Sequence, residues 1–146
     1  MENIRKALLA DLGSIAKYYG PKGDTPLDPF TSEERMRQMV SLDDLVVAEV
    51  DGSFAGFVYF FVDNHPWFEP EVERYGHILE VHVKKEYQGV GLATRMLEYT
   101  IEDLKKRDVN VVYIDTGGNN TKAIRLYEKM GFREFGRTIH FKKTIA

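Results

Sequence analysis

The residues best suited to chemistry stand in a short glycine-containing turn, Gln88 to Ala93, between a predicted strand and a predicted helix. Gly89 and Gly91 let the backbone approach a ligand closely, because glycine has no side chain and adopts conformations that strain other residues. The first N–H groups of the following helix lack partners within the helix and carry partial positive charge toward an anion. Strand, glycine turn and helix together therefore predict a phosphate-binding site.

Two common phosphate-binding sequences do not fit this turn. A P-loop continues with Lys and then Ser or Thr, where this chain has Leu92 and Ala93. A dinucleotide-binding turn needs a third glycine, near Thr94 in this chain, and an acidic residue after a following strand. The pattern that fits is Gln-x-x-Gly-x-Ala, beginning at Gln88. A plain glycine turn before a core helix is the alternative interpretation of these six positions taken alone.

A second motif begins at Asn120 and ends at Phe132. It has the form Asn-x-x-Ala-x-x-Leu-Tyr-x-x-x-Gly-Phe, in which the tyrosine is Tyr127 and the glycine is Gly131. Its periodicity predicts a helix from Thr121 to Met130, capped at its start by a turn cluster and closed by Gly131 in the left-handed conformation. The two motifs follow one another in a fixed order, so together they are far more specific than either alone.

Together these motifs resemble the GNAT N-acetyltransferase superfamily, most closely the type that acetylates N-terminal amines. The resemblance covers essentially the whole chain and is weakest over residues 21–44 and 63–74. It implies an α/β fold, in which a mixed, twisted central sheet is flanked by helices and its fourth and fifth strands splay apart around acetyl-CoA. In this chain those strands would be His77 to Val83 and Val109 to Asp115. We expect residues 1–146 to form a single N-acetyltransferase domain.

The resemblance also assigns residues to acetyl-CoA, the expected co-substrate. Backbone groups of Val81 and Val83, with His82 between them, would pair with the pantetheine arm like an added strand. Asn120 would contact the pantetheine region. No metal is expected. Backbone amides of the turn would hold the pyrophosphate, and they belong to Gln88, Gly89, Val90, Gly91, Leu92, Ala93 and Thr94.

Tyr127 is the residue that the resemblance places at the departing CoA sulfur. A phenol of pKa ~10 is a weaker acid than a thiol of pKa ~8.5, so complete proton transfer to the thiolate is uphill by about 2 kcal/mol. Hydrogen bonding to the sulfur, with late or partial transfer, therefore describes the step better than full protonation. A buried tyrosine with a structural hydrogen bond is the alternative.

The resemblance also implies that His77 and Asp115, at positions where relatives carry a base, are the candidates for the group that removes a proton from the acceptor amine. We expect them to share one ordered water, since an ordinary histidine of pKa ~6.5 suits proton removal at neutral pH better than an ordinary aspartate. The structural alternatives are a polar group at a strand edge for His77 and a turn former for Asp115. Glu80 alternates with Leu79 and Val81, so we expect it on the other face of the sheet.

Hydrophobic periodicity predicts the remaining elements. Strands are expected from Ile4 to Ala7, Leu45 to Val50, Phe54 to Val62, Phe132 to Thr138 and Ile139 to Thr144, with Asp51-Gly52 as a hairpin turn. One helix should start near Asp11, bury Leu12, Ile15, Ala16 and Tyr19, and end at Gly20-Pro21, and another should run from a Thr31 cap to Ser41. Between residues 63 and 74, Trp67 and Phe68 either line an acceptor pocket or pin the loop.

Composition limits the function classes. The 146 residues are 43% hydrophobic and suit one soluble domain. The absence of cysteine excludes disulfides, thiolate zinc sites and a cysteinyl intermediate, and fits a reducing compartment. No apolar run approaches the ~20 residues of a membrane span, and the first residues lack a signal peptide's apolar core. We therefore expect a cytoplasmic protein without a membrane partner. A homodimer is one assembly that we consider.

Charge is spread unevenly along the chain. Residues 1–76 hold 14 acidic and 7 basic side chains, whereas residues 77–146 hold 9 acidic and 13 basic ones. A basic half suits a polyphosphate ligand and an acidic half suits a cationic acceptor, while no basic stripe indicates nucleic acid. The expected acceptor is a primary amine, most simply a peptide or protein N-terminus. The alternatives are a small cationic amine, such as a polyamine or amino sugar, and a CoA-binding module without catalysis.

Overall fold

The computed structural model describes residues 1–19 and 33–146, which divide into two compact units, Met1–Asp115 and Thr116–Ala146. Predictions about the Gly20-Pro21 helix end and the Thr31 cap lie outside the described residues. The assignment of residues 1–146 to a single domain stays a prediction. None of the helices in the described ranges is long and apolar enough to cross a membrane.

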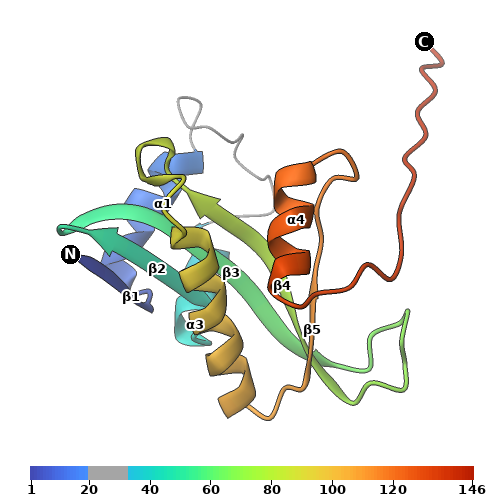
Figure 1. Ribbon diagram of the computed structural model, residues 1–146, viewed down its shortest axis with the longest axis horizontal. Helices are drawn as coiled ribbons and strands as arrows, with labels where there is room; N and C mark the ends of the chain where they lie inside the picture. The colour runs from blue at the N-terminus through green and yellow to red at the C-terminus, as the bar shows by residue number, and fades with distance from the viewer. Residues whose placement is uncertain (20–32) are drawn as a thin grey trace. The chain divides into compact units, whose positions relative to one another are not determined.

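Five strands of the first unit form one mixed sheet in the order β1-β2-β3-β4-β5, which confirms the predicted fold class (Figure 1). Neighbours from β1 to β4 are antiparallel, and β5 pairs with β4 in parallel. The predicted hairpin turn is confirmed, because Asp51 and Gly52 both have positive φ, as a type I′ turn requires. The strands are β1 (Glu2–Lys6), β2 (Leu45–Val50), β3 (Ser53–Asn64), β4 (Arg74–Val83) and β5 (Val111–Ile114).

Helices cover both faces of the sheet. The helices α1 (Leu12–Tyr19) and α2 (Glu33–Ser41) share a core with one face of β2 and β3, and α3 (Leu92–Lys106) packs on the other (Figure 1). Gly76 marks the α3 face, since a Cβ there would lie 2.9 Å from both Leu104 methyl groups. The first core contains Ile15, Met36, Met39, Leu45, Val47 and Phe57. Ala16, predicted to be inside, is exposed.

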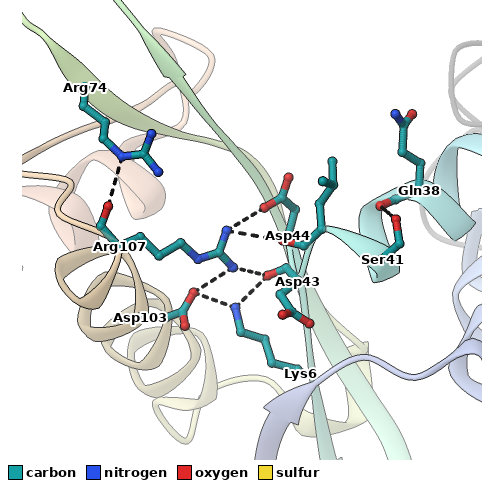
Figure 2. Close-up of polar contacts among 9 residues, drawn as sticks. Lys6, Gln38, Ser41, Asp43, Asp44, Arg74, Asp103 and Arg107 are labelled. Carbon is teal, nitrogen blue, oxygen red and sulfur yellow. Dashed lines mark hydrogen bonds and ion pairs between the residues drawn. The ribbon is translucent and has the colours of Figure 1, made fainter.

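An ion-pair cluster ties the C-terminal end of α3 to the turn between α2 and β2 (Figure 2). Arg107 lies 2.9 Å from the Asp44 carboxylate and 3.0 Å from the Asp103 carboxylate, and Lys6 of β1 also bonds Asp103 at 2.6 Å. Both cations lie over the Phe60 ring, 5.0 and 5.2 Å from its centroid. Burial raises the pKa of Asp44 despite Arg107 beside it. The cluster therefore keeps a buried carboxylate paired where the turn meets the sheet.

The second unit contains the helix α4 (Thr121–Lys129) with both of its predicted caps. The Asn120 side chain accepts a hydrogen bond from the Ala123 N–H at 3.2 Å. At the other end Gly131 has a φ of 98°, and the Phe132 N–H donates to the Tyr127 carbonyl at 2.9 Å. This pairing is the Schellman motif, so the predicted helix and both of its ends are confirmed.

The two strands predicted over Phe132 to Thr138 and Ile139 to Thr144 are wrong. Residues 132–146, all of which the structure describes, form neither helix nor strand. Four large apolar side chains of this segment are 62–93% exposed, and they belong to Phe135, Ile139, Phe141 and Ile145. Alternating apolar residues predict a strand only if a neighbouring strand supplies hydrogen bonds, and sequence alone cannot identify that neighbour.

Candidate active site

The fourth and fifth strands diverge, as predicted. β5 pairs with β4 only from Tyr75 to Ile78, so the rest of β4 has no strand on that side among the described residues (Figure 1). On its other side, β4 stays paired with β3 as far as Val83. The Lys84 N–H donates to the Ala55 carbonyl of β3, and backbone direction alternates along a strand. The backbone groups of Val83 and Val81 therefore point toward the open edge.

The glycine turn connects this edge to the N-terminus of α3. Gly89 and Gly91 have φ values of 83° and 82°, a conformation that other residues adopt only with strain. The Gln88 side chain donates to the Val83 carbonyl at 2.9 Å, a bond the sequence analysis missed, and so fixes the turn to the strand. A Cβ on Gly91 would lie 2.9 Å from a guanidinium nitrogen of Arg95, which is paired with Glu2. The turn thus leaves its backbone accessible.

His77 and Asp115 lie in direct contact, with His77 Nε2 2.6 Å from Asp115 Oδ2. His77 is on β4, and Asp115 directly follows β5, so the parallel pairing of the two strands brings them together. The structure shows this direct contact, and the expectation that the two side chains share one ordered water stays a prediction. A carboxylate that accepts from one imidazole nitrogen orients the ring and fixes which nitrogen can take a proton.

A β-bulge in β4 shifts the alternation of its side chains. Tyr59 of β3 pairs with Glu80 and the next residue, Phe60, pairs with Ile78, so Leu79 is an extra residue between two successive pairs. One extra residue moves every side chain beyond it to the opposite face of the regular pattern. The bulge is therefore a device that re-aims side chains in the middle of the site.

The bulge places Glu80 on the same face as His77, so the prediction that it faces the other way is wrong. Cross-strand partners share a face, and Phe61 and Phe57 of β3 pair with His77 and His82. The ring centroids of these two pairs are 5.4 and 5.0 Å apart. His77, Glu80 and His82 consequently line the face of the sheet that α1 and α2 cover.

Glu80 and His82 form a second histidine–carboxylate pair, with His82 Nε2 2.5 Å from Glu80 Oε2. The His82 ring packs against Phe57 and lies 5.4 Å from the Tyr18 ring of α1. Its side chain is 17% exposed and that of Glu80 is 31% exposed. His82 was predicted only as a cofactor-binding residue. Its pairing with Glu80 was not predicted, although residues two apart on a strand share a face.

A cavity of about 140 Å³ opens on this same face, between α2 and β3. Two of its lining residues, Tyr59 and Phe61, are the cross-strand partners of Glu80 and His77. Asp44 joins it to the ion-pair cluster at the α2–β2 turn. Among the described residues, the cavity is lined by Arg35, Gln38, Met39, Leu42, Asp44, Tyr59 and Phe61.

The loop after β3 is held by Phe68 and Glu69. The Phe68 ring lies 4.9 Å from that of Tyr113 on β5, and the Tyr113 hydroxyl donates to Glu69 at 2.7 Å. Burial, followed by the hydrogen bond to Glu69, raises the pKa of Tyr113. Trp67 is 88% exposed, and neither it nor Phe68 lines the cavity. Of the two interpretations of the loop, pinning describes Phe68.

Tyr127 and Asn120 belong to the second unit, where their surroundings are local. The Tyr127 ring packs edge-on against Phe132 at 6.0 Å, and burial raises the pKa of its phenol. Such a phenol stays protonated at neutral pH and can donate a hydrogen bond. The side-chain oxygen of Asn120 accepts the hydrogen bond that caps α4.

A family model described as "Acetyltransferase (GNAT) family" matches residues 14–132. Similar proteins include an N-alpha-acetyltransferase of Sulfurisphaera tokodaii, 28% identical over 99 residues that make up 65% of this chain and 59% of that protein. A ribosomal protein bS18 alanine N-acetyltransferase of Escherichia coli is 37% identical over 57 residues, 39% of this chain and 38% of that protein. The matches thus span about two-fifths to three-fifths of these curated relatives.

Solved structures show the same fold. The NatC complex bound to Gag peptide and CoA has a TM-score of 0.77 at 21% identity, covering 93% of this chain and 87% of that chain. An aminoglycoside acetyltransferase from an uncultured soil metagenomic sample, in complex with trehalose, has a TM-score of 0.73 at 13% identity and covers 99% of this chain and 97% of its own. Identities this low bear on the fold alone.

Proposed function

Because this chain belongs to the acetyltransferase (GNAT) family, we propose that it transfers an acetyl group from acetyl-CoA directly to the amino terminus of a peptide or protein. The observation that carries the proposal is the His77–Asp115 pair, which lies on β4 and at the end of β5 where the two strands diverge. The names of the relatives, N-alpha-acetyltransferase among them, support the choice of an α-amine.

Acetyl-CoA would bind along the open edge of β4 and the turn after it. The backbone groups of Val81 and Val83 that point to this edge can pair with the amides of the pantetheine arm, as an added strand would. The Val83 carbonyl would accept a hydrogen bond from the pantetheine arm in addition to the one that it accepts from the Gln88 side chain. The left-handed Gly89 and Gly91 expose backbone N–H groups, and the first turn of α3 adds its own to the pyrophosphate.

The reaction then needs one base, one oxyanion donor and one group at the leaving sulfur. In our proposal His77, oriented by Asp115, removes a proton from the ammonium, directly or through a water, and the freed amine attacks the thioester carbonyl. The N–H of Leu79, the extra residue of the bulge, would donate to the carbonyl oxygen as it becomes negative. The carbon–sulfur bond then breaks, the nitrogen loses its extra proton to water or to the leaving thiolate, and Tyr127 would hydrogen-bond that thiolate.

The acid strength of the acceptor favours an N-terminus over a lysine side chain. An α-amine has a pKa near 7.7–8.0 and a lysine near ~10.4, so deprotonating lysine at neutral pH costs about 3.5 kcal/mol more. A single histidine–carboxylate pair supplies modest basicity. It therefore suits an amine that is already partly uncharged.

Matched peptides test this proposal. Each contains one lysine, and its N-terminus is either free or blocked, so that thiol release from acetyl-CoA and mass spectrometry locate the acetyl group. We expect rapid transfer to the free N-terminus and at least about 10-fold slower transfer to lysine in the blocked peptide. Equal rates would overturn the N-terminal preference, and transfer to small amines alone would favour a small-molecule acceptor.

A Gly91→Glu variant tests the proposed acetyl-CoA site. It places a carboxylate in the turn, and calorimetry should show that acetyl-CoA binding is lost while the circular dichroism of the folded chain is kept. A folded variant with unchanged affinity for acetyl-CoA would contradict the proposed site. Release of no thiol by the unaltered chain, in the presence of acetyl-CoA and every amine tried, would leave a CoA-binding module.

A further inference from the structure

Two histidine–carboxylate pairs stand on one face of β4, and the proposed reaction uses only one of them. His77–Asp115 lies where β4 and β5 diverge, and Glu80–His82 lies beyond the bulge toward the glycine turn. Positions on one strand face that are separated by one intervening residue lie roughly 7 Å apart, and the bulge adds little to that span. The second carboxylate is therefore within reach of a substrate whose amine is at His77.

A hydrogen bond to His82 fixes the position of the Glu80 carboxylate. Its Oε2 accepts from His82, whose ring is mostly buried beside Phe57 and Tyr18 and has little freedom to move. A carboxylate has two oxygens and about four acceptor positions, so this bond leaves Oε1 able to accept from a ligand. Glu80 therefore presents a fixed hydrogen-bond acceptor on the face of the sheet where the substrate amine is proposed to bind.

We propose that Glu80, positioned by His82, selects acceptors that carry a second positive charge within a few residues of the amine that is acetylated. The inference rests on the proposed function and names its substrate class. A carboxylate that is already oriented pairs with a guanidinium or ammonium without paying the ordering entropy of a mobile side chain, and charge-assisted bonds are about twice as strong as neutral ones.

The cavity between α2 and β3 gives such an acceptor room. Its Tyr59 and Phe61 rings belong to the cross-strand partners of Glu80 and His77, so the cavity adjoins the two carboxylate pairs although neither pair lines it. Aromatic faces attract cations and exclude water, which strengthens an ion pair formed beside them. A basic side chain that follows the reactive amine would lie against this aromatic wall and end at Glu80.

The test compares peptides with a free N-terminus that carry Arg, Gln or Glu at position one, two or three and are otherwise identical. Arginine is chosen because it adds charge and cannot itself be acetylated in place of the N-terminus. We expect kcat/KM for the Arg peptide to exceed that for the Gln peptide by about 10-fold at one of these positions, with the Glu peptide slowest. In Glu80→Gln this ratio should fall close to one.

Three further variants separate the proposal from a general loss of structure. Glu102→Gln removes an exposed carboxylate of α3 that pairs with Lys105 on the surface, and it should keep the Arg preference. His82→Gln retains an N–H donor for Glu80 and should keep most of the preference, whereas His82→Phe keeps an aromatic ring without the donor and should lose part of it.

An Arg preference that persists in Glu80→Gln would overturn the role of Glu80, as would a wild-type chain that acetylates Arg and Gln peptides equally. Both results leave the proposed N-terminal acetyltransferase intact. Failure of the wild-type chain to acetylate any peptide would overturn the proposed function and this inference together. The outcomes of the two proposals can thus be told apart.

Discussion

His77 and Asp115 form a hydrogen-bonded pair, and the proposed reaction uses the two side chains together. The carboxylate accepts from Nε2, so the other nitrogen, Nδ1, is the position that takes a proton when the ring acts as a base. The His77 side chain is 17% exposed, whereas that of Asp115 is 74% exposed. The imidazole is therefore mostly buried, whereas the carboxylate that orients it is largely exposed to solvent.

Substitution of either member should lower turnover by a similar factor. We expect His77→Gln and Asp115→Asn each to reduce kcat roughly 10²-fold, and the double variant to be little worse than either, because the two act as a unit. The KM for acetyl-CoA should change little. Steady-state kinetics of the three variants checks this.

His65→Gln is the matched control, because His65 is exposed and its ring lies 3.0 Å from the Pro70 carbonyl of the same loop. It should retain full turnover. Single variants at His77 and Asp115 that stay within threefold of the unaltered chain would remove both residues from the reaction, as would two losses that simply multiply in the double variant.

Among the elements, β4 and α3 were largely predictable and the bulge was not. The glycine turn, the amphipathic α3 and the capped α4 follow from short-range patterns, because a cap or a turn is decided by residues within four or five positions. The bulge at Leu79 is decided by which β3 residue stands opposite, more than fifteen positions away. Glu80 was therefore assigned to the wrong face by an alternation rule that holds elsewhere in the sheet.

The same distinction explains the His77–Asp115 contact and the Arg107 cluster. His77 and Asp115 were singled out by resemblance, and only the β4–β5 register shows that they touch. Nothing in the sequence near Arg107 indicates that it pairs with Asp44 across the fold. Long-range ion pairs of this kind have no periodic signature, so patterns along the chain cannot reveal them.

The Arg107 cluster should account for a measurable part of the stability of the first unit. Arg107→Ala would leave the buried Asp44 carboxylate without its guanidinium, and we expect the free energy of unfolding to fall by about 3 kcal/mol. Urea denaturation measures the change. Adding Asp44→Asn should recover part of it, since the uncompensated charge is then gone.

Lys105→Ala provides the comparison for this prediction. Lys105 pairs with Glu102 at the surface, both side chains being 64% exposed, and such pairs contribute ~0–1 kcal/mol. A loss as large as that of Arg107→Ala would mean that helix α3 itself, and not the buried pairing, explains the effect.

At the scale of the whole chain, the extended segment after α4 differs from the rest. Residues 133–146 have no regular hydrogen bonding, and their apolar side chains are exposed. Amides without such bonds exchange with solvent almost freely. We expect hydrogen exchange followed by mass spectrometry to find these amides at least about 10³-fold less protected than those in the middle of α3.

Protection of residues 133–146 equal to that of α3 would contradict this expectation. It would mean that the segment pairs with a strand edge in solution, as its alternating sequence first indicated, and a size measurement in solution would then show whether the edge belongs to a second copy. The proposed homodimer stays a prediction until that measurement.

The open stretch of β4, from Leu79 to Val83, would make the stability of the folded protein depend on the supply of acetyl-CoA. If acetyl-CoA completes this edge as proposed, every bound molecule contributes to the fold, and ligand at a hundredfold excess over its Kd adds about 2.7 kcal/mol to stability. Unfolding and degradation would then slow when activated acetate is plentiful and quicken when it is scarce. A cell would hold more of this protein when it has acetyl groups to spare, before any change in gene expression.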